Sequence, residues 1–234
     1  MRLRPAHELL DEDEGSPAEI RRSLRELWWI NRRLGGLSSW RSLLAAWQAA
    51  APAAPPALTL LDVGAGSGEL AAWIAAELGR GGGAVRAVAL DRRASHLAAA
   101  AGPLRLAGDA LRLPFADATV DLVACNLFLH HFHDAPGDAA ATRLLREMAR
   151  VARGAVLIND LDRAWIPYAF IRLLGVRFSR ITRHDGPRSV AQAYTAPELR
   201  RLAAAALPAW RCEVRRIWPY RLGLILWRGA GRAV

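Results

Sequence analysis

The sequence contains no lysine, and all 32 of its basic residues are arginine. Against 22 acidic residues they give a formal net charge of +10. Basic surfaces attract phosphate backbones and anionic lipids, but these arginines are scattered along the chain instead of forming a block. Nucleic acid is therefore not the expected partner. The coding bias of a GC-rich genome explains the missing lysine, although it does not explain the sign of the charge.

Cysteine is scarce, and long apolar runs are absent. Cys125 and Cys212 provide neither a disulfide framework nor metal-ligand spacing, as expected for a reducing cytoplasm. No stretch reaches the roughly 18 uncharged apolar residues of a spanning helix, and the first residues lack the apolar run of a secretory signal. We expect a soluble cytoplasmic protein that forms a single structural unit, since 234 residues with 53% hydrophobic content suffice for one core.

A strand candidate that ends in an acid and a glycine-rich turn occupies residues 58–69, which read Leu-Thr-Leu-Leu-Asp-Val-Gly-Ala-Gly-Ser-Gly-Glu. Glycines at positions 64, 66 and 68 allow the backbone to turn sharply and to approach a ligand closely. A dinucleotide-binding fold would place its third glycine one residue later, where Glu69 stands. The turn therefore indicates a nucleotide-like cofactor and disfavours an NAD-dependent oxidoreductase.

Three further strand candidates end in polar residues. They are 84–90, followed by Asp91; 104–107, followed by Gly-Asp-Ala; and 120–126, which runs into Leu-Phe-Leu-His-His-Phe. An acid at the end of the second strand can accept two hydroxyl hydrogen bonds, as it does on a ribose in the dinucleotide fold. Taken singly, Asp91 is also explained as a helix N-cap and Asp109 as a turn residue.

In this order, the four segments resemble the motifs of the class I S-adenosylmethionine-dependent methyltransferases. The pattern is similar to the methyltransferase-11/12-like branch, related to quinone-biosynthesis C-methyltransferases and to enzymes that tailor phenolic lipids and polyketides. The resemblance runs from the glycine turn to a fifth strand candidate at 155–158. It implies a Rossmann-like α/β fold with a mostly parallel seven-stranded sheet, an antiparallel C-terminal hairpin and an N-terminal helical cap. It also implies S-adenosylmethionine as the cofactor.

The resemblance assigns roles to the acids at the strand ends. Asp91 would bind the ribose, Asp109 would accept a hydrogen bond from the adenine amino group, and Asp62 would help to position the amino-acid end of the cofactor. With their neighbours, the predicted cofactor-binding residues are Asp62, Gly64, Ala65, Gly66, Gly68, Asp91, Arg92, Gly108, Asp109, Ala110 and Asn126.

The chain divides into a predicted helical cap, residues 1–51, and a methyltransferase domain, residues 52–234. In the cap, apolar residues recur at helical spacing over 18–34 and 38–50, and the Gly35-Gly36 pair separates the two helices. The cap either packs passively or closes over cofactor and substrate, and a basic amphipathic helix also suits peripheral contact with a membrane. Strands and helices then alternate as in a parallel sheet, and 211–218 with 221–227 predict an antiparallel hairpin.

Residues 159–193 are predicted to form an insert that acts as a lid on the substrate side, because ligands bind beyond the carboxyl ends of the strands. The insert is largely apolar, so it can wall a hydrophobic pocket, lie on a bilayer or simply pack in the core. Its end, 180–187, reads Arg-Ile-Thr-Arg-His-Asp-Gly-Pro and is interpreted as a turn that brings together a base, two cations and a carboxylate.

Methyl transfer needs alignment and, for a phenol or an acidic carbon, a general base. Histidine suits this task near neutral pH. We take His184, His130 and His131 as the catalytic candidates, with His133 as a further base, and keep catalysis by alignment alone as the alternative. Asn126, Asn159 and Asp160 occupy places where related enzymes hold magnesium, but a single carboxylate is a poor cage, so no metal is predicted.

These observations predict O- or C-methylation of a small hydrophobic acceptor that is phenolic, quinone-like or derived from a polyketide. RNA methylation is one alternative, although the sequence after the fourth strand candidate lacks the Asp/Asn-Pro-Pro-Tyr/Phe turn typical of enzymes that methylate exocyclic amines. A non-catalytic module that binds the cofactor or a partner is another. The sequence leaves the acceptor atom and the oligomeric state open.

Overall fold

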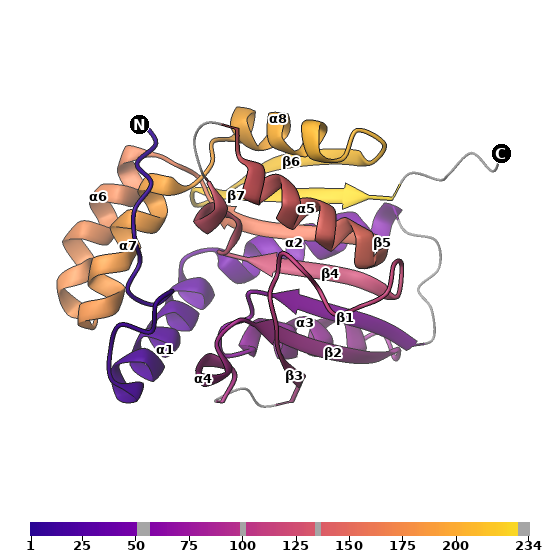
Figure 1. Cartoon of the computed structure of the whole chain (residues 1–234), viewed down its shortest axis with the longest axis horizontal. Coiled ribbons are helices and arrows are strands. Elements are labelled where there is room, and N and C mark those ends of the chain that lie inside the picture. Colours follow the sequence, from indigo (N-terminus) through magenta and orange to yellow (C-terminus); the bar gives the residue numbers. More distant parts are fainter. Residues whose placement is uncertain (51–56, 99–101, 134–136, 229–234) are drawn as a thin grey trace.

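The computed structural model describes residues 1–50, 57–98, 102–133 and 137–228 (Figure 1). Seven strands form one sheet in the order β3-β2-β1-β4-β5-β7-β6. The first five in sequence run parallel, and the last two run antiparallel to their neighbours. The strands are β1 (Ala57–Val63), β2 (Ala84–Asp91), β3 (Leu104–Ala107), β4 (Val120–Asn126), β5 (Ala152–Leu161), β6 (Arg211–Ile217) and β7 (Arg221–Trp227). This confirms the predicted Rossmann-like sheet and its C-terminal hairpin.

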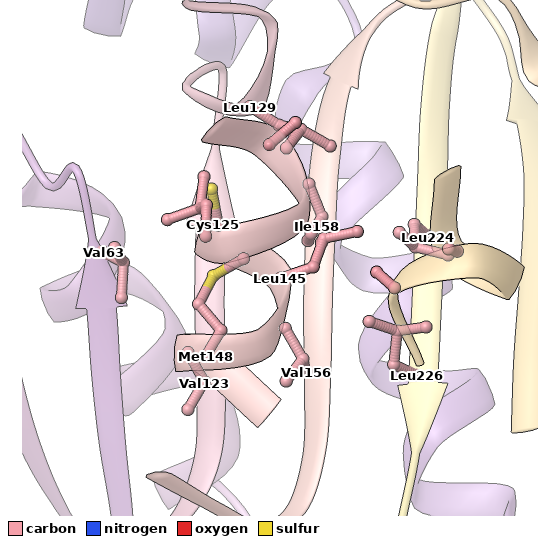
Figure 2. Close-up of a cluster of buried hydrophobic side chains, with 14 of the residues drawn as sticks. Val63, Val123, Cys125, Leu129, Leu145, Met148, Val156, Ile158, Leu224 and Leu226 are labelled. Carbon is pink, nitrogen blue, oxygen red and sulfur yellow. The ribbon is translucent and has the colours of Figure 1, made fainter. Parts of the chain in front are cut away.

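Helices cover both faces of the sheet, so successive strand residues are buried in two different cores. On β4, Val123 and Cys125 point into the first core, whereas Leu122 and Ala124 point into the second. The first core lies under α5 (Ala139–Val151) and α8 (Ala196–Ala206), and part of it is drawn in Figure 2. The second lies under α2 (Gly36–Ala50) and α3 (Glu69–Gly79).

The N-terminal helices begin close to the predicted positions. α1 (Pro17–Arg33) starts with a capping box, in which the backbone N–H of Ser16 donates to Glu19 at 2.9 Å. Gly36 is not a separator, as the sequence suggested, but the first residue of α2. A Cβ there would lie 1.8 Å from Oδ1 of Asn31, so the glycine lets the two helix ends meet. The proposed boundary at residues 51 and 52 lies outside the described residues.

Beyond the carboxyl ends of the parallel strands, α1 lies with α6 (Trp165–Leu174) and α7 (Arg180–Gln192), and a short 3-10 turn η2 (Gly175–Arg177) joins the last two (Figure 1). The insert starts later than predicted, because residues 159–161 still pair with β7. Residues 180–187 are not a turn: they belong to α7, which contains Pro187 in its interior. The helix forms there because Ile181 is buried against Leu9, Ile20 and Leu24.

After β2, the alternating pattern continues with the short helix α4 (Ala94–Leu97), and residues 99–101 lie outside the described part of the chain. A 3-10 turn, η1 (Leu129–Phe132), follows β4 and carries the two adjacent histidines. Within the ranges described, none of the helices combines the length and apolar character that crossing a bilayer requires.

Candidate active site

A cavity of about 780 Å³ lies where the parallel strands end. Its walls come from the glycine turn after β1, the ends of β2 and β4, η1, α1, α6, α7 and the turn between β6 and β7. A volume of this size is typical of pockets that hold a small molecule or a cofactor. The predicted cofactor residues, the two adjacent histidines and the apolar insert therefore border one space.

The glycine turn forms one end of the cavity. Gly64, Gly66 and Gly68 all have positive φ angles, between 53° and 76°. A Cβ on Gly64 would lie 2.4 Å from the ring of Phe128, so no other residue fits at that position. Gly64, Ala65 and Gly66 line the cavity, whereas Gly68 does not and instead caps α3.

Asp91 connects this turn to the next strand. Its Oδ2 accepts the backbone N–H of Gly66 at 2.8 Å, and its Oδ1 accepts that of Arg93 at 2.9 Å. Asp91 is therefore not the N-cap of α4, a position that Arg93 occupies. Each carboxylate oxygen keeps a lone pair for a ligand hydroxyl. Its neighbour Arg92 is exposed and also lines the cavity.

Asp62 is the most unusual group at this end. It is 1% exposed, lines the cavity and has no hydrogen-bond partner for either carboxylate oxygen among the described residues. Burial raises its pKa to about 8; the nearby backbone N–H of Ala71 opposes this rise, and the charges of Asp91 and Glu69 add to it. An orphaned buried acid fits a ligand that brings a cationic hydrogen-bond donor.

The remaining predicted cofactor residues also line the cavity. Asp109 is exposed and lies beside Gly108 and Ala110. Its Oδ1 accepts the N–H of Leu111 at 2.8 Å. This is the geometry of a turn residue, the alternative that the sequence left open for Asp109. Asn126 uses its Oδ1 to accept from Trp40 Nε1 at 2.9 Å and from Asn159 Nδ2 at 2.8 Å. Its amide is therefore held in place.

The middle of the cavity contains His130, which is 2% exposed. Its Nδ1 lies 2.6 Å from Oδ1 of Asp160, and its backbone N–H donates to Oδ2 of the same carboxylate. Its Nε2 is buried without a hydrogen-bond partner and lies 3.8 Å from Oε1 of Glu8. The pKa of Asp160 is lowered, because His130 outweighs the opposing effect of burial.

His131 stacks on His130 with ring centroids 4.3 Å apart, and its Nδ1 lies 2.7 Å from Oδ2 of Asp11. Burial favours the neutral ring, but Glu8 and Asp11 overcome this effect and raise the pKa of His131 to about 9. His131 is consequently a cation at neutral pH.

The other two candidate bases, His184 and His133, do not line the cavity. His184 lies on α7, where its Nδ1 contacts Asp185 Oδ1 at 2.7 Å, and it is not a lining residue. His133 bonds to the carbonyl oxygen of Gln192 and stacks on Tyr194. Both rings therefore serve local contacts.

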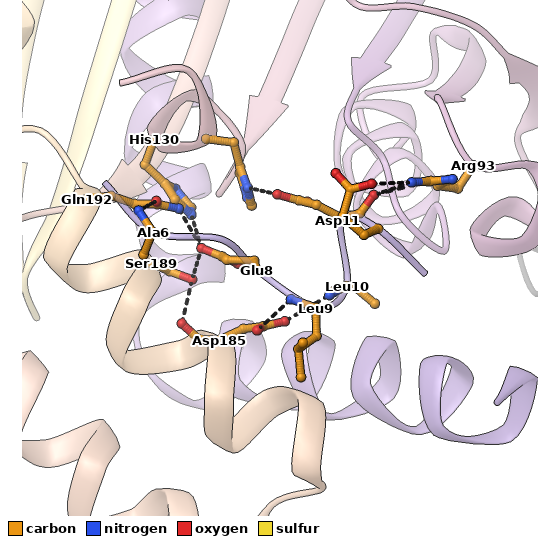
Figure 3. Close-up of polar contacts among 12 residues, drawn as sticks. Ala6, Glu8, Leu9, Leu10, Asp11, Arg93, His130, Asp185, Ser189 and Gln192 are labelled. Atoms are coloured by element: carbon orange, nitrogen blue, oxygen red, sulfur yellow. Dashed lines mark hydrogen bonds and ion pairs between the residues drawn. The ribbon is translucent and has the colours of Figure 1, made fainter. Parts of the chain in front are cut away.

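An N-terminal strap, residues 6–12, covers the histidine pair (Figure 3). Asp185 accepts the backbone N–H groups of Leu9 and Leu10 at 2.9 and 3.1 Å. Buried Glu8 accepts from Ser189 Oγ at 2.9 Å and from Gln192 Nε2 at 2.6 Å. The strap could not be predicted from the sequence, because residues 6–12 carry neither periodicity nor a motif. The acidic run that starts at residue 11 was the only signal.

Glu8, His130 and His131 could also hold a metal ion, since each offers one ligand atom and these atoms lie within 4.8 Å of one another. This cluster differs from the set considered in the sequence, because Asn126 bonds to Asn159 and Asp160 bonds to His130. A metal there would first have to displace the proton on His131.

Apolar residues line the far end of the cavity. Ile166, Phe170 and Ile171 of α6 face it, together with Trp218 after β6. Leu173 and Val176 are exposed elsewhere on the insert and do not line the cavity. The apolar residues of the insert therefore divide between the cavity and the outer surface.

A model of the methyltransferase domain family matches residues 61–158. The plantazolicin methyltransferase BpumL, solved with a pentazolic analogue and SAH, is 13% identical over 88% of this chain and 90% of that chain, with a TM-score of 0.66. A SAM-dependent methyltransferase from Aquifex aeolicus is 18% identical over 80% and 88%, with a TM-score of 0.57. Magnesium protoporphyrin IX methyltransferase from Synechocystis PCC 6803, with bound SAH, is 15% identical over 85% and 82%, with a TM-score of 0.51. The comparison with curated proteins gave no match.

Proposed function

We propose that this chain is a class I S-adenosylmethionine-dependent methyltransferase and that it methylates an oxygen or carbon atom of a small hydrophobic acceptor. The proposed acceptor is phenolic, quinone-like or derived from a polyketide, and the proposed role is in secondary metabolism in the cytoplasm. The observation that carries the proposal is one cavity that is lined by the glycine turn, the two adjacent histidines and the apolar residues of α6.

The residues at the glycine turn fit the cofactor. Asp62 is buried without a partner and suits the ammonium group of the amino-acid end, and Asp91 keeps free lone pairs for the ribose hydroxyls. Gly64 and Gly66 leave room where a side chain would collide with Phe128 or require a strained backbone. Asp109 would receive the adenine amino group on the oxygen that Leu111 does not use.

When bound, S-adenosylmethionine supplies an electrophilic methyl group on a good leaving group, so the protein contributes alignment and deprotonation of the acceptor. Asp160 binds Nδ1 of His130 and favours the tautomer that carries its proton there. Nε2 of His130 is then an acceptor without a hydrogen-bond partner, on a residue that lines the cavity. We assign His130 as the general base.

His131 has a different role in this proposal. Because its raised pKa keeps it protonated at neutral pH, it cannot accept the acceptor's proton there. Its positive charge instead stabilises the anion that forms when the acceptor is deprotonated. His184 is not proposed as a catalytic residue, because its ring lies outside the cavity lining.

The surrounding segments exclude water from this chemistry. We propose that residues 159–193 act as a substrate-side lid and that residues 1–51 form a cap, of which α1 and the strap border the cavity. Apolar residues of α6 would hold the acceptor body. The exposed apolar side chains of the insert, Trp165 and Leu173 among them, support peripheral contact with a membrane.

The test is transfer of a labelled methyl group from S-adenosylmethionine to a panel that contains quinones, alkylresorcinols, pyrones and RNA. We expect transfer to a hydrophobic aromatic class and none to RNA. Transfer to RNA, with strongly salt-dependent binding, would replace this proposal with the nucleic-acid alternative. Binding of the donor without transfer to any compound would favour the non-catalytic alternative.

A further inference from the structure

The end of α1 meets the turn between β6 and β7 at the edge of the cavity. The carbonyl oxygen of Leu34 lies 3.5 Å from Nη2 of Arg221, and a Cβ on Gly35 would lie 2.3 Å from Pro219. One turn earlier on α1, the side chain of Asn31 lies against Gly36. Asn31 and Arg221 therefore lie at the same junction, and both line the cavity.

Arg221 is 3% exposed, and no carboxylate of the described ranges lies within ion-pair distance of it, although the charge of nearby Asp160 partly offsets the effect of burial on its pKa. Its Nη1 is buried without a hydrogen-bond partner, and the long contact to Leu34 is the hydrogen bond that Nη2 makes. A buried guanidinium normally binds a carboxylate or phosphate through two parallel N–H groups. An arginine that is buried but unpaired is therefore prepared for an anion that enters the cavity.

Asn31 is the second unsatisfied group at this junction. It is 1% exposed, and neither Oδ1 nor Nδ2 has a hydrogen-bond partner. Leaving buried polar atoms unpaired is unfavourable, so native proteins rarely keep such atoms without a ligand or water. The amide can donate to the same anion that Arg221 binds and accept from a neighbouring hydroxyl.

The sheet order separates this junction from the cofactor residues. Asp62 is the second-last residue of β1, whereas Arg221 begins β7, three strands away in the order β1-β4-β5-β7. Neighbouring strands are spaced by about 4.8 Å, so the two strands are about 14 Å apart.

The junction lies close to the proposed base instead. Arg221 pairs in the sheet with Leu161, which directly follows Asp160 on β5. Asp160 holds His130, so the proposed base and Arg221 are positioned by two neighbouring strands, β5 and β7. Apolar side chains of Ile166, Phe170 and Trp218 line the same end of the cavity.

We propose that Arg221, assisted by Asn31, binds a carboxylate on the acceptor, so that the preferred substrates are hydroxylated aromatic acids with an apolar substituent. This inference rests on the proposed function and narrows its substrate class. In this proposal Arg221 determines substrate specificity, since it holds the acceptor without touching the transferred methyl group.

The test uses two probes that differ by one group: olivetolic acid, an alkylated dihydroxybenzoic acid, and olivetol, the same molecule without the carboxylate. Calorimetry measures the binding of each to the complete chain saturated with SAH, and the affinity for SAH is measured separately. We expect the wild-type complex to bind the acid at least about 10-fold more tightly than olivetol. Arg221→Gln should weaken acid binding about 10- to 100-fold and leave olivetol and SAH binding unchanged.

Arg216→Gln is the matched control, because it removes an exposed arginine of the same hairpin that pairs with Asp162 outside the cavity. It should keep the preference for the acid. Asn31→Asp provides a second variant if Arg221→Gln does not fold: a carboxylate beside the guanidinium should abolish the preference for the acid.

Equal binding of the two probes, including no binding of either, overturns the inference, as does a preference that persists in Arg221→Gln. A loss of SAH affinity in Arg221→Gln that matches its loss of acid affinity also overturns it, because the arginine would then hold the cofactor's own carboxylate. These results leave the proposed function standing, since that function is tested by donor binding and by transfer to the wider panel.

Discussion

His130 and Asp160 form a buried pair in which the ring Nδ1 lies 2.6 Å from a carboxylate oxygen while the ring Nε2 has no hydrogen-bond partner. The carboxylate comes from β5 and the ring from η1, so the pair joins two neighbouring strands at their carboxyl ends. This arrangement leaves one ring nitrogen of a cavity-lining residue unpaired.

His130→Gln should lower kcat about 100- to 10,000-fold, because the acceptor loses its base. The affinity for SAH, measured by calorimetry, should stay unchanged. Asp160→Asn should lower kcat as well, since the asparagine no longer selects the productive tautomer. His184→Gln is the control, and equal activity losses at His184 and His130 would contradict the assignment.

His131 should make the stability of the protein depend on pH above neutrality. Its pKa is about 9 in the folded protein, against an ordinary value of 6.5 that applies to the unfolded chain. Its contribution to the free energy of unfolding is therefore complete below pH 6.5 and is lost as the pH rises through 9. The loss is of the order of 3 kcal/mol. Urea denaturation at several pH values measures it, and the difference between wild type and His131→Gln should shrink to near zero by pH 10. A difference that stays constant with pH would contradict the raised pKa.

Asp62 should release a proton when the donor binds. Burial raises its pKa to about 8, so the free enzyme holds it neutral at pH 7, whereas a ligand ammonium group favours the carboxylate. Affinity for SAH should therefore increase from pH 6 to pH 8, by at most about tenfold per pH unit. The calorimetric enthalpy at pH 7 should differ between phosphate and Tris buffers. Asp62→Asn should abolish that difference, and its persistence in the variant would assign the proton to another group.

Removing the unpaired arginine should stabilise the ligand-free protein. Burial lowers the pKa of Arg221 to about 10, which shows that the folded environment disfavours its charge. Arg221→Met should therefore raise the free energy of unfolding, by about 1 to 3 kcal/mol. Arg216→Met, an exposed exchange, should change it little. A marked destabilisation by Arg221→Met would mean that the charge already has a partner in the free protein.

The strap should loosen when Asp185 is replaced. Asp185→Ala removes the acceptor of two backbone N–H groups, those of Leu9 and Leu10. Hydrogen exchange at these amides should accelerate at least about 10-fold, because hydrogen bonds to a charged group contribute substantially. Asp117→Ala, which alters an exposed acid, should leave their exchange unchanged. Unchanged exchange in Asp185→Ala would show that other contacts hold the strap.

Local patterns in the sequence were sufficient for the sheet. Buried strands alternating with amphipathic helices predicted its parallel part, and the two runs around Pro219 predicted the hairpin. The glycine turn and Asp91 were also found, because their spacing along the chain is fixed by the turn they form.

Features made by distant segments were not predictable in this way. Asp185 holds Leu9 across 176 residues, and no periodicity connects the two. The same holds for Arg221 and Asn31, which line one cavity only because the hairpin folds back against the end of α1. His184 was chosen for its charged neighbours, yet the helical phase of α7 turns Asp185, and not the histidine, toward the strap and the cavity.

The bond between the Gly66 amide and Asp91 has a consequence for binding thermodynamics. It fixes the glycine turn before any ligand arrives, together with the bond from the Ala65 amide to the carbonyl oxygen of Leu90. Binding of the donor therefore costs little backbone entropy at this turn, so the contacts that the turn makes with the donor contribute almost fully to the affinity. A preorganised turn of this kind should bind the demethylated product as readily as the donor, so we expect the product to inhibit the enzyme.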